Sequence, residues 1–146
     1  HELADATARA KQTLINCVGD ERGRWVVGAH AEGRSELRLT GITEGLRVNV
    51  VIDRTFVDEK GVRWIIDYKT SGHEGGDIAV FLDNEQGRYR GQLERYASLM
   101  QAGGAPQGDL LRGAPQGDLL RGAQRIRLGL YFPLLGGWRE WSYEPQ

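Results

Sequence analysis

Two short stretches, Val51-Ile52-Asp53-Arg54 and Ile65-Ile66-Asp67-Tyr68-Lys69-Thr70, decide the fold of this chain. Each joins charged residues to an apolar, β-branched run of the kind that forms strands. Between them lies Asp58-Glu59-Lys60-Gly61, a turn sequence whose glycine suits a positive φ. The pattern therefore predicts a β-hairpin with strands over 47–57 and 62–70.

The predicted hairpin gathers charged side chains on one patch of the sheet. Because side chains alternate along a strand, Asp67 and Lys69 project from the same face, and strand pairing can bring Asp53 near Asp67. Two clustered carboxylates repel each other unless a cation lies between them, and Mg²⁺ prefers such oxygen ligands. A metal there would activate a water that Lys69 could orient. The residues therefore indicate a metal site, and the alternative is a surface hairpin with an ordinary salt bridge.

Length and composition place the rest of the chain in the same class. Its 146 residues are 40% hydrophobic and 27% charged, which is typical of one globular domain. We expect an α/β fold with a mixed central β-sheet flanked by helices, and the four tryptophans in its core. Periodicity and turn residues predict helices over 5–18 and 85–100, and further strands over 24–29, 35–40, 125–135 and 138–143.

The remaining composition excludes several classes of protein. The formal net charge of -1 excludes a strongly basic nucleic-acid coat protein, although it permits an enzyme with a local basic patch. A single cysteine, Cys17, excludes an internal disulfide and any CxxC site, and it reads as a buried helix residue. No apolar run is long enough for a membrane span and no signal-peptide pattern is present, so we expect a cytoplasmic protein.

A tandem repeat interrupts the second half of the chain. The nine residues from Gly104 to Arg112 recur unchanged as Gly113 to Arg121. Glycine and proline are frequent there, so we expect a mobile surface loop over 103–124, produced by a duplication that a loop tolerates. The alternative is a partner-binding ribbon that uses its Leu-Leu pairs.

Three motifs in order resemble one nuclease family. Asp53-Arg54, then Ile66-Asp67-Tyr68-Lys69-Thr70-Ser71, then Gln92-Leu93-Glu94-Arg95-Tyr96 are similar to the "iDr", "DYKT" and "QLxxY" motifs of the PD-(D/E)XK nuclease superfamily. Within it, the chain looks like the RecB/AddA-type C-terminal nuclease domain of a bacterial helicase–nuclease, a UvrD/Rep helicase-like protein. The resemblance runs from about Trp25 to Tyr143 and implies a restriction-endonuclease-like fold.

The resemblance also implies roles for individual residues. Asp53 and Asp67 would bind Mg²⁺ or Mn²⁺ together with the Tyr68 backbone carbonyl, and Lys69 would serve the attacking water. Glu36 resembles the acidic residue that precedes the core motifs and is a further candidate ligand; its alternative is a solvent-facing strand position. For substrate binding the candidates are Gln92, Tyr96, Arg54 and Arg88, with Arg90 and Arg95 near the same motifs. Each of these has an ordinary structural alternative.

The implied function is metal-dependent hydrolysis of DNA phosphodiester bonds, of exonuclease type, in repair or recombination. The implied partners are DNA, a helicase motor in a missing N-terminal part of a longer parent chain, and a second helicase–nuclease subunit. The chain lacks a P-loop, iron–sulfur cysteines and the upstream histidine of the family; His30 reads as a surface residue, and His73 as a candidate substrate contact. The alternatives are a nuclease-like module that only binds DNA or scaffolds a complex, and a protein-assembly domain.

Overall fold

The computed structural model describes residues 2–73, 75–103, 105–106 and 125–145. It has a six-stranded mixed sheet in the order β4-β1-β2-β3-β5-β6, in which β3 and β5 are parallel and every other neighbouring pair is antiparallel. The elements are α1 (Glu2–Gly19), α2 (Glu21–Val27), β1 (Ala31–Thr43), β2 (Leu46–Val57), β3 (Arg63–Tyr68), α3 (Ile78–Gln101), β4 (Ala105–Pro106), β5 (Ile126–Phe132) and β6 (Gly137–Ser142). The α/β class expected from the sequence is confirmed.

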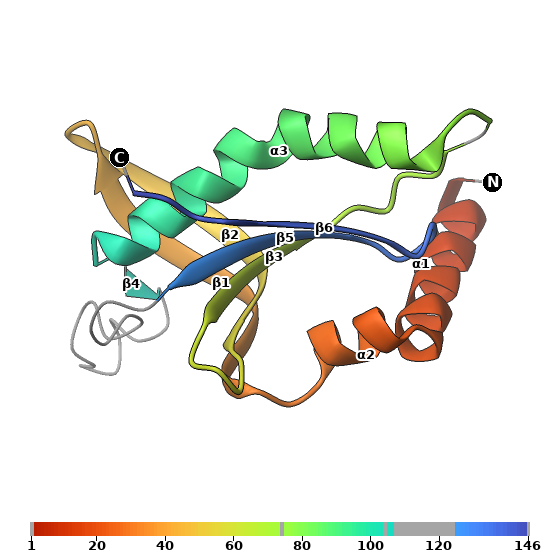
Figure 1. Ribbon diagram of the computed structural model, residues 1–146, viewed down its shortest axis with the longest axis horizontal. Helices are drawn as coiled ribbons and strands as arrows, with labels where there is room; N and C mark the ends of the chain where they lie inside the picture. Colours follow the sequence, from red (N-terminus) through yellow and green to blue (C-terminus); the bar gives the residue numbers. More distant parts are fainter. Residues whose placement is uncertain (1, 74, 104, 107–124, 146) are drawn as a thin grey trace.

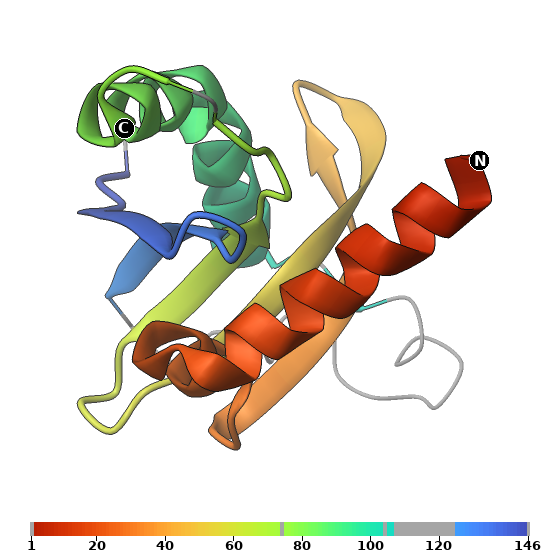
Figure 2. The same ribbon diagram turned by 90° about the vertical axis from the view of Figure 1, so that its right-hand side faces the viewer.

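Helices lie on both sides of the sheet (Figures 1 and 2). α3 covers one face, and α2 with the end of α1 packs on the other. The alternation along β3 makes this possible, because Ile65 points into the α3-side core while Trp64 and Ile66 point into the α2-side core. A strand that is apolar on both faces is typical of a sheet buried on both sides.

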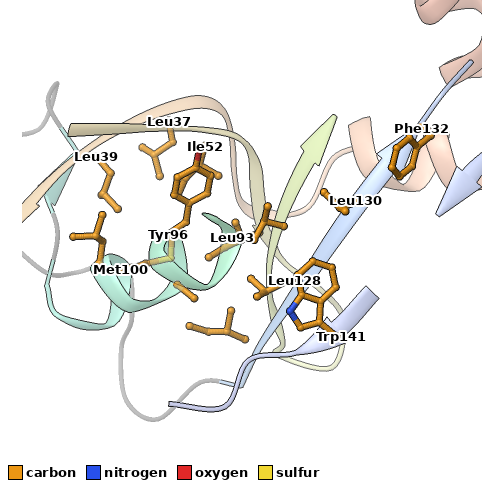
Figure 3. Packing of buried hydrophobic residues seen from close by; sticks show 14 of the residues in the cluster. Leu37, Leu39, Ile52, Leu93, Tyr96, Met100, Leu128, Leu130, Phe132 and Trp141 are labelled. Carbon is orange, nitrogen blue, oxygen red and sulfur yellow. The ribbon is translucent and has the colours of Figure 1, made fainter. Parts of the chain in front are cut away.

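The α3-side core is the larger of the two clusters, and Figure 3 shows its packing. Leu93 and Met100 of α3 are almost completely buried, at 0% and 1% exposed. They pack with side chains from five strands, among them Leu39, Ile52 and Leu128. Burying one such side chain contributes roughly 1.5–3 kcal/mol, so this cluster fixes α3 over the sheet.

The prediction of a strand over 24–29 is wrong, because residues 21–27 form the helix α2. Asp20 caps this helix by accepting a hydrogen bond from the Arg22 N–H at 3.4 Å. Gly23 lies so close to the Cys17 backbone that an added Cβ would come within 2.3 Å of the Cys17 carbonyl oxygen. The apolar run of Trp25 to Val27 is too short for its periodicity to distinguish a helix turn from a strand.

The other expected elements are present, with different ends. The hairpin, the 5–18 helix and the last two strands are confirmed, and the 35–40 strand extends over Ala31–Thr43. α3 begins seven residues before the expected start, because Asp77 caps it by accepting from the Ala79 N–H at 2.8 Å. Of the expected repeat loop, residues 104 and 107–124 lie outside the described residues, and Ala105–Pro106 pairs with Thr40 and Leu39 as β4.

The tryptophans lie where the sequence predicts. Trp64 and Trp141 are buried, and Trp25 and Trp138 are half-buried against the α2-side core. Cys17 is buried too, as expected. Among the described residues, no helix is both long enough and apolar enough to cross a membrane.

Candidate active site

The candidate site lies where β2 separates from β3. The antiparallel pairing of these strands ends at Arg54 and Ile66, so Asp53 and Asp67 occupy the next position of the register without being paired. Instead of a backbone carbonyl, the Asp53 carboxylate accepts the hydrogen bond of the Tyr68 N–H, through Oδ2 at 2.9 Å. This bond fixes the Asp53 carboxylate against the carboxyl end of β3.

An irregularity in the strand directs Asp53 to this position. Ile52 packs in the α3-side core, whereas Arg54 bonds to α2 on the opposite side of the sheet. In a regular strand, residues two apart share a face, so the alternation must reverse at Asp53. The neighbouring strand reverses at the same level: Ser35 bonds to Arg54, Leu37 packs in the α3-side core, and Glu36 between them has a φ of 52°.

Asp67 and Lys69 share the α3 side of β3, as the alternation predicts. The Lys69 Nζ lies 2.7 Å from Asp67 Oδ2, and the two side chains are only 17% and 10% exposed. The Lys69 N–H donates to the Tyr131 carbonyl at 2.8 Å, which fixes the backbone beyond the end of β3. Apart from this ion pair, Asp67 Oδ2 has no hydrogen-bond partner among the described residues.

Electrostatics couple the two carboxyl groups. Burial raises the pKa of Asp53 from 3.8 to about 6, and a hydrogen bond and like charge from Asp67 add to the rise. The Tyr68 N–H and the Lys69 charge act in the opposite direction, but they do not compensate for burial. Two carboxyl groups in contact hold a proton more tightly because neither ionises easily beside the other.

These residues fit a divalent cation. The two adjoining carboxylates, with Asp67 Oδ2 buried and contacted only by the Lys69 ammonium among the described residues, form the hard-oxygen donor set that Mg²⁺ and Mn²⁺ accept. A metal held by Asp53 and Asp67 would lower the pKa of a bound water and offset charge on a phosphoryl group. Within the described part of the chain, no group of three or more His, Cys, Asp or Glu side chains gathers as a metal cluster. From the described residues, the Tyr68 backbone carbonyl is a further candidate ligand, and waters would complete the set.

Glu36 does not join the two carboxylates in this structure. It lies on β1 at the level of Asp53, but its side chain is exposed and it forms no acidic cluster with them in the described residues. Its left-handed φ is uncommon for a residue with a side chain, and it belongs to the irregularity that turns Asp53.

The Gln92 and Tyr96 side chains meet one turn apart on α3, as their spacing predicts. Gln92 Nε2 donates to the Tyr96 hydroxyl at 2.6 Å, and Tyr96 is 8% exposed in the α3-side core. Gln92 is half-buried. The pair thus occupies the sheet-facing side of the helix that passes over the end of β3.

The arginines expected near the site have two different environments. Arg54 is 8% exposed and donates to the Val26 and Gly28 carbonyls at 2.9 and 2.7 Å, which suits a role in holding α2 to the sheet. Arg88, by contrast, lies exposed on α3 beside the ring of Tyr89, where it can reach solvent and a phosphate. Arg90 and Arg95 are also exposed on α3.

The histidines pack against rings. His30, expected at the surface, is half-buried and stacks on Phe56 with ring centroids 3.9 Å apart. His73 stacks on Phe81, 4.6 Å between centroids, in the loop that leads from the site to α3. An open hollow of about 710 Å³ lies between α1 and Thr70, the residue that follows Lys69 in the chain.

One contact of the site was not predicted from the sequence. The Lys69 Nζ lies 3.6 Å from the ring centroid of Tyr89, a residue of the expected 85–100 helix for which the sequence predicts no role at the site. Its position three residues before Gln92, on the sheet-facing side of α3, was the signal that could have suggested a role at the site.

A mixed α/β sheet that presents two adjoining carboxylates and a lysine at the end of one strand fits the class of metal-dependent hydrolases. The family model of the PD-(D/E)XK nuclease superfamily matches residues 3–129, so the chain belongs to this superfamily. Its members typically use a divalent metal, and membership indicates phosphodiester hydrolysis. No curated protein sequence matches the chain significantly.

Proposed function

We propose that this chain is a Mg²⁺- or Mn²⁺-dependent deoxyribonuclease that hydrolyses DNA phosphodiester bonds. The observation that supports the proposal is the juxtaposition of Asp53, Asp67 and Lys69 at the end of β3. The resemblance of its motifs to those of the superfamily implies a use for that set: two carboxylates for the metal and an ammonium group for the attacking water.

The residues divide the chemistry between them. Asp53 and Asp67 would hold the cation at the strand end, and Lys69 would donate hydrogen bonds to the attacking water and orient it toward phosphorus. A bond forms from the water oxygen to phosphorus as the bond to the leaving sugar oxygen breaks, and the proton of water passes to solvent or the leaving oxygen. The low exposure of Lys69 and Asp67 limits screening by water, which strengthens these interactions.

We further propose that the activity is of exonuclease type and serves DNA repair or recombination in the bacterial cytoplasm. A helicase motor and a second helicase–nuclease subunit are its proposed partners. The order of the three motifs and their spacing support this finer proposal, since RecB/AddA-type nuclease domains have the same order. Exposed arginines on α3, Arg88 among them, would hold the DNA backbone.

Cleavage of labelled DNA tests the proposal. Single- and double-stranded linear DNA and a closed circle are incubated with the chain in Mg²⁺, in Mn²⁺ and in EDTA. We expect cleavage of linear DNA with metal, none in EDTA, and none of the circle by an exonuclease. Lys69→Ala should lose the activity, whereas Lys60→Ala, at the exposed far end of the hairpin, should keep it. DNA binding without cleavage would favour the non-catalytic alternative.

A further inference from the structure

The Lys69 ammonium is held from two sides. On one side it forms the 2.7 Å ion pair with Asp67, and on the other it lies 3.6 Å from the centre of the Tyr89 ring. A cation within about 6 Å of an aromatic face is attracted by the ring quadrupole, and this one lies well inside that limit. Tyr89 itself is half-buried and packs against the α3-side core, so its ring is fixed from behind.

The ring contact matters because Asp67 has a second role under the proposed function. A carboxylate that binds a metal donates electron density to it, and its attraction for the neighbouring ammonium falls. Lysine has a flexible four-carbon stem, so an ammonium held by Asp67 alone would be free to swing away when the metal binds. The attraction between the Tyr89 ring face and the Lys69 ammonium does not depend on Asp67, so it persists whether or not Asp67 binds a metal.

We propose that Tyr89 is a positioning residue, whose ring face holds the Lys69 ammonium where water and phosphate meet. The inference rests on the proposed function, and it assigns to α3 a part in the chemistry besides covering the core. The proposed role depends on the ring and not on the hydroxyl, because the Lys69 ammonium lies over the centre of the ring.

Three variants separate positioning from packing. Tyr89→Phe keeps the ring, Tyr89→Leu removes it but keeps an apolar side chain, and Tyr143→Leu is a matched control. Tyr143 is likewise half-buried against the α3-side core, but it lies beyond β6. With DNA and Mg²⁺, we expect Tyr89→Leu to lower kcat about tenfold with KM within about twofold, as loss of a partly desolvated cation–π contact would. Tyr89→Phe and Tyr143→Leu should remain within about twofold of the parent kcat. Equal losses in Tyr89→Phe and Tyr89→Leu, or in Tyr89→Leu and Tyr143→Leu at similar Tm, would overturn the proposal.

A second readout does not depend on activity. The sequence has three lysines, Lys11, Lys60 and Lys69, so ¹³Cε-labelled lysine gives three assignable NMR signals. We expect the Lys69 Hε protons to be shifted upfield by the ring in the parent and in Tyr89→Phe, and to move to the position of a solvated lysine in Tyr89→Leu. An unshifted Lys69 signal in the parent would overturn the proposal. A Tyr89-dependent shift in a chain that cleaves no DNA would support the positioning and count against the proposed function alone.

Discussion

At the scale of single residues, Asp53 combines a structural bond with an unfavourable charge. Its carboxylate caps the Tyr68 N–H, yet burial and Asp67 raise its pKa from 3.8 to about 6. The same side chain is thus fixed in place and poor at staying ionised without a cation. That combination is typical of functional sites, where groups are held in environments that only a ligand makes favourable.

The raised pKa of Asp53 predicts a pH dependence in the absence of metal. The folded state keeps the Asp53 proton to a higher pH than the unfolded chain does. Proton binding by Asp53 therefore stabilises the folded state, and this contribution is fully present below pH 3.8. The effect is lost as pH rises through about 6. We expect the Tm of the parent in EDTA to fall relative to that of Asp53→Asn across this window. Metal affinity, which needs the ionised group, should rise across it. Parallel Tm curves for the two proteins would contradict this assignment.

Gly129 is a second position where a single added atom is expected to change stability. A Cβ at this buried site on β5 would lie 2.5 Å from the ring of Trp138, which is held in the aromatic cluster of the α2 side. We expect Gly129→Ala to lower the free energy of unfolding in urea by about 1–3 kcal/mol. Gly91→Ala is the matched control: its Cβ meets nothing within 4 Å on helix α3, so it should stabilise by about 0.5–1 kcal/mol. Equal effects of the two substitutions would refute the close packing.

At the scale of elements, α2 is tied to the sheet by a buried side chain. The Arg54 guanidinium bonds to the Val26 and Gly28 carbonyls at the end of the helix and to the Ser35 hydroxyl on β1. The contact joins a helix, a strand and the connection between them. It explains how a seven-residue helix, too short to be stable alone, keeps its position.

Burial distinguishes Arg54 from Arg88, although the sequence predicts the same substrate-binding role for both. We expect Arg54→Leu to lower the free energy of unfolding by about 2–4 kcal/mol, because it leaves two carbonyls without their charged donor. Arg88→Ala should change it by less than about 0.5 kcal/mol, but should weaken DNA binding and reduce its salt dependence by about one charge. Urea denaturation and binding titrations at several salt concentrations measure both. A stable Arg54→Leu with weakened DNA binding would return Arg54 to the substrate-binding group.

The sequence determines these elements to different extents. The hairpin and the placement of Asp67 beside Lys69 follow from alternation alone, and its register brings Asp53 to the same level. The helix α2 does not follow, because its apolar run is equally strand-like and the close contact of Gly23 with the Cys17 backbone exists only in the folded chain. Burial distinguishes Arg54 from Arg88, and the Tyr89 contact depends on how α3 crosses the sheet. Such tertiary facts leave no local sequence pattern.

At the scale of the whole molecule, the topology assembles the site. The chain runs from β3 to α3 and returns to β5, which is parallel to β3, so α3 is the helix of a crossover connection. This helix lies over the end of β3 (Figure 1). The carboxyl ends of strands beside such a crossover are the usual place for ligands in α/β sheets. Asp67 and Lys69 come from that strand end, and Tyr89, Gln92 and Tyr96 come from the helix above it.

The near-zero net charge is consistent with this arrangement. A formal charge of -1 gives no long-range attraction for DNA, so binding must depend on local groups. The exposed arginines are local cations on α3, the helix that covers the site, and a divalent cation would offset the Asp53 and Asp67 carboxylates when DNA approaches. We therefore expect weak, salt-dependent binding by this chain that strengthens with divalent metal.

The role of Lys69 in metal-dependent cleavage is measured by the initial rate of nucleotide release from linear DNA in Mg²⁺, compared between the parent and Lys69→Ala at equal folded concentration. We expect release by the parent that EDTA abolishes, and a rate at least about a hundredfold lower in Lys69→Ala, as for loss of a group that stabilises the transition state. Folding of the variant is checked by its Tm. Equal rates for parent and variant, or release that continues in EDTA, would contradict a metal-dependent site built on Asp53, Asp67 and Lys69.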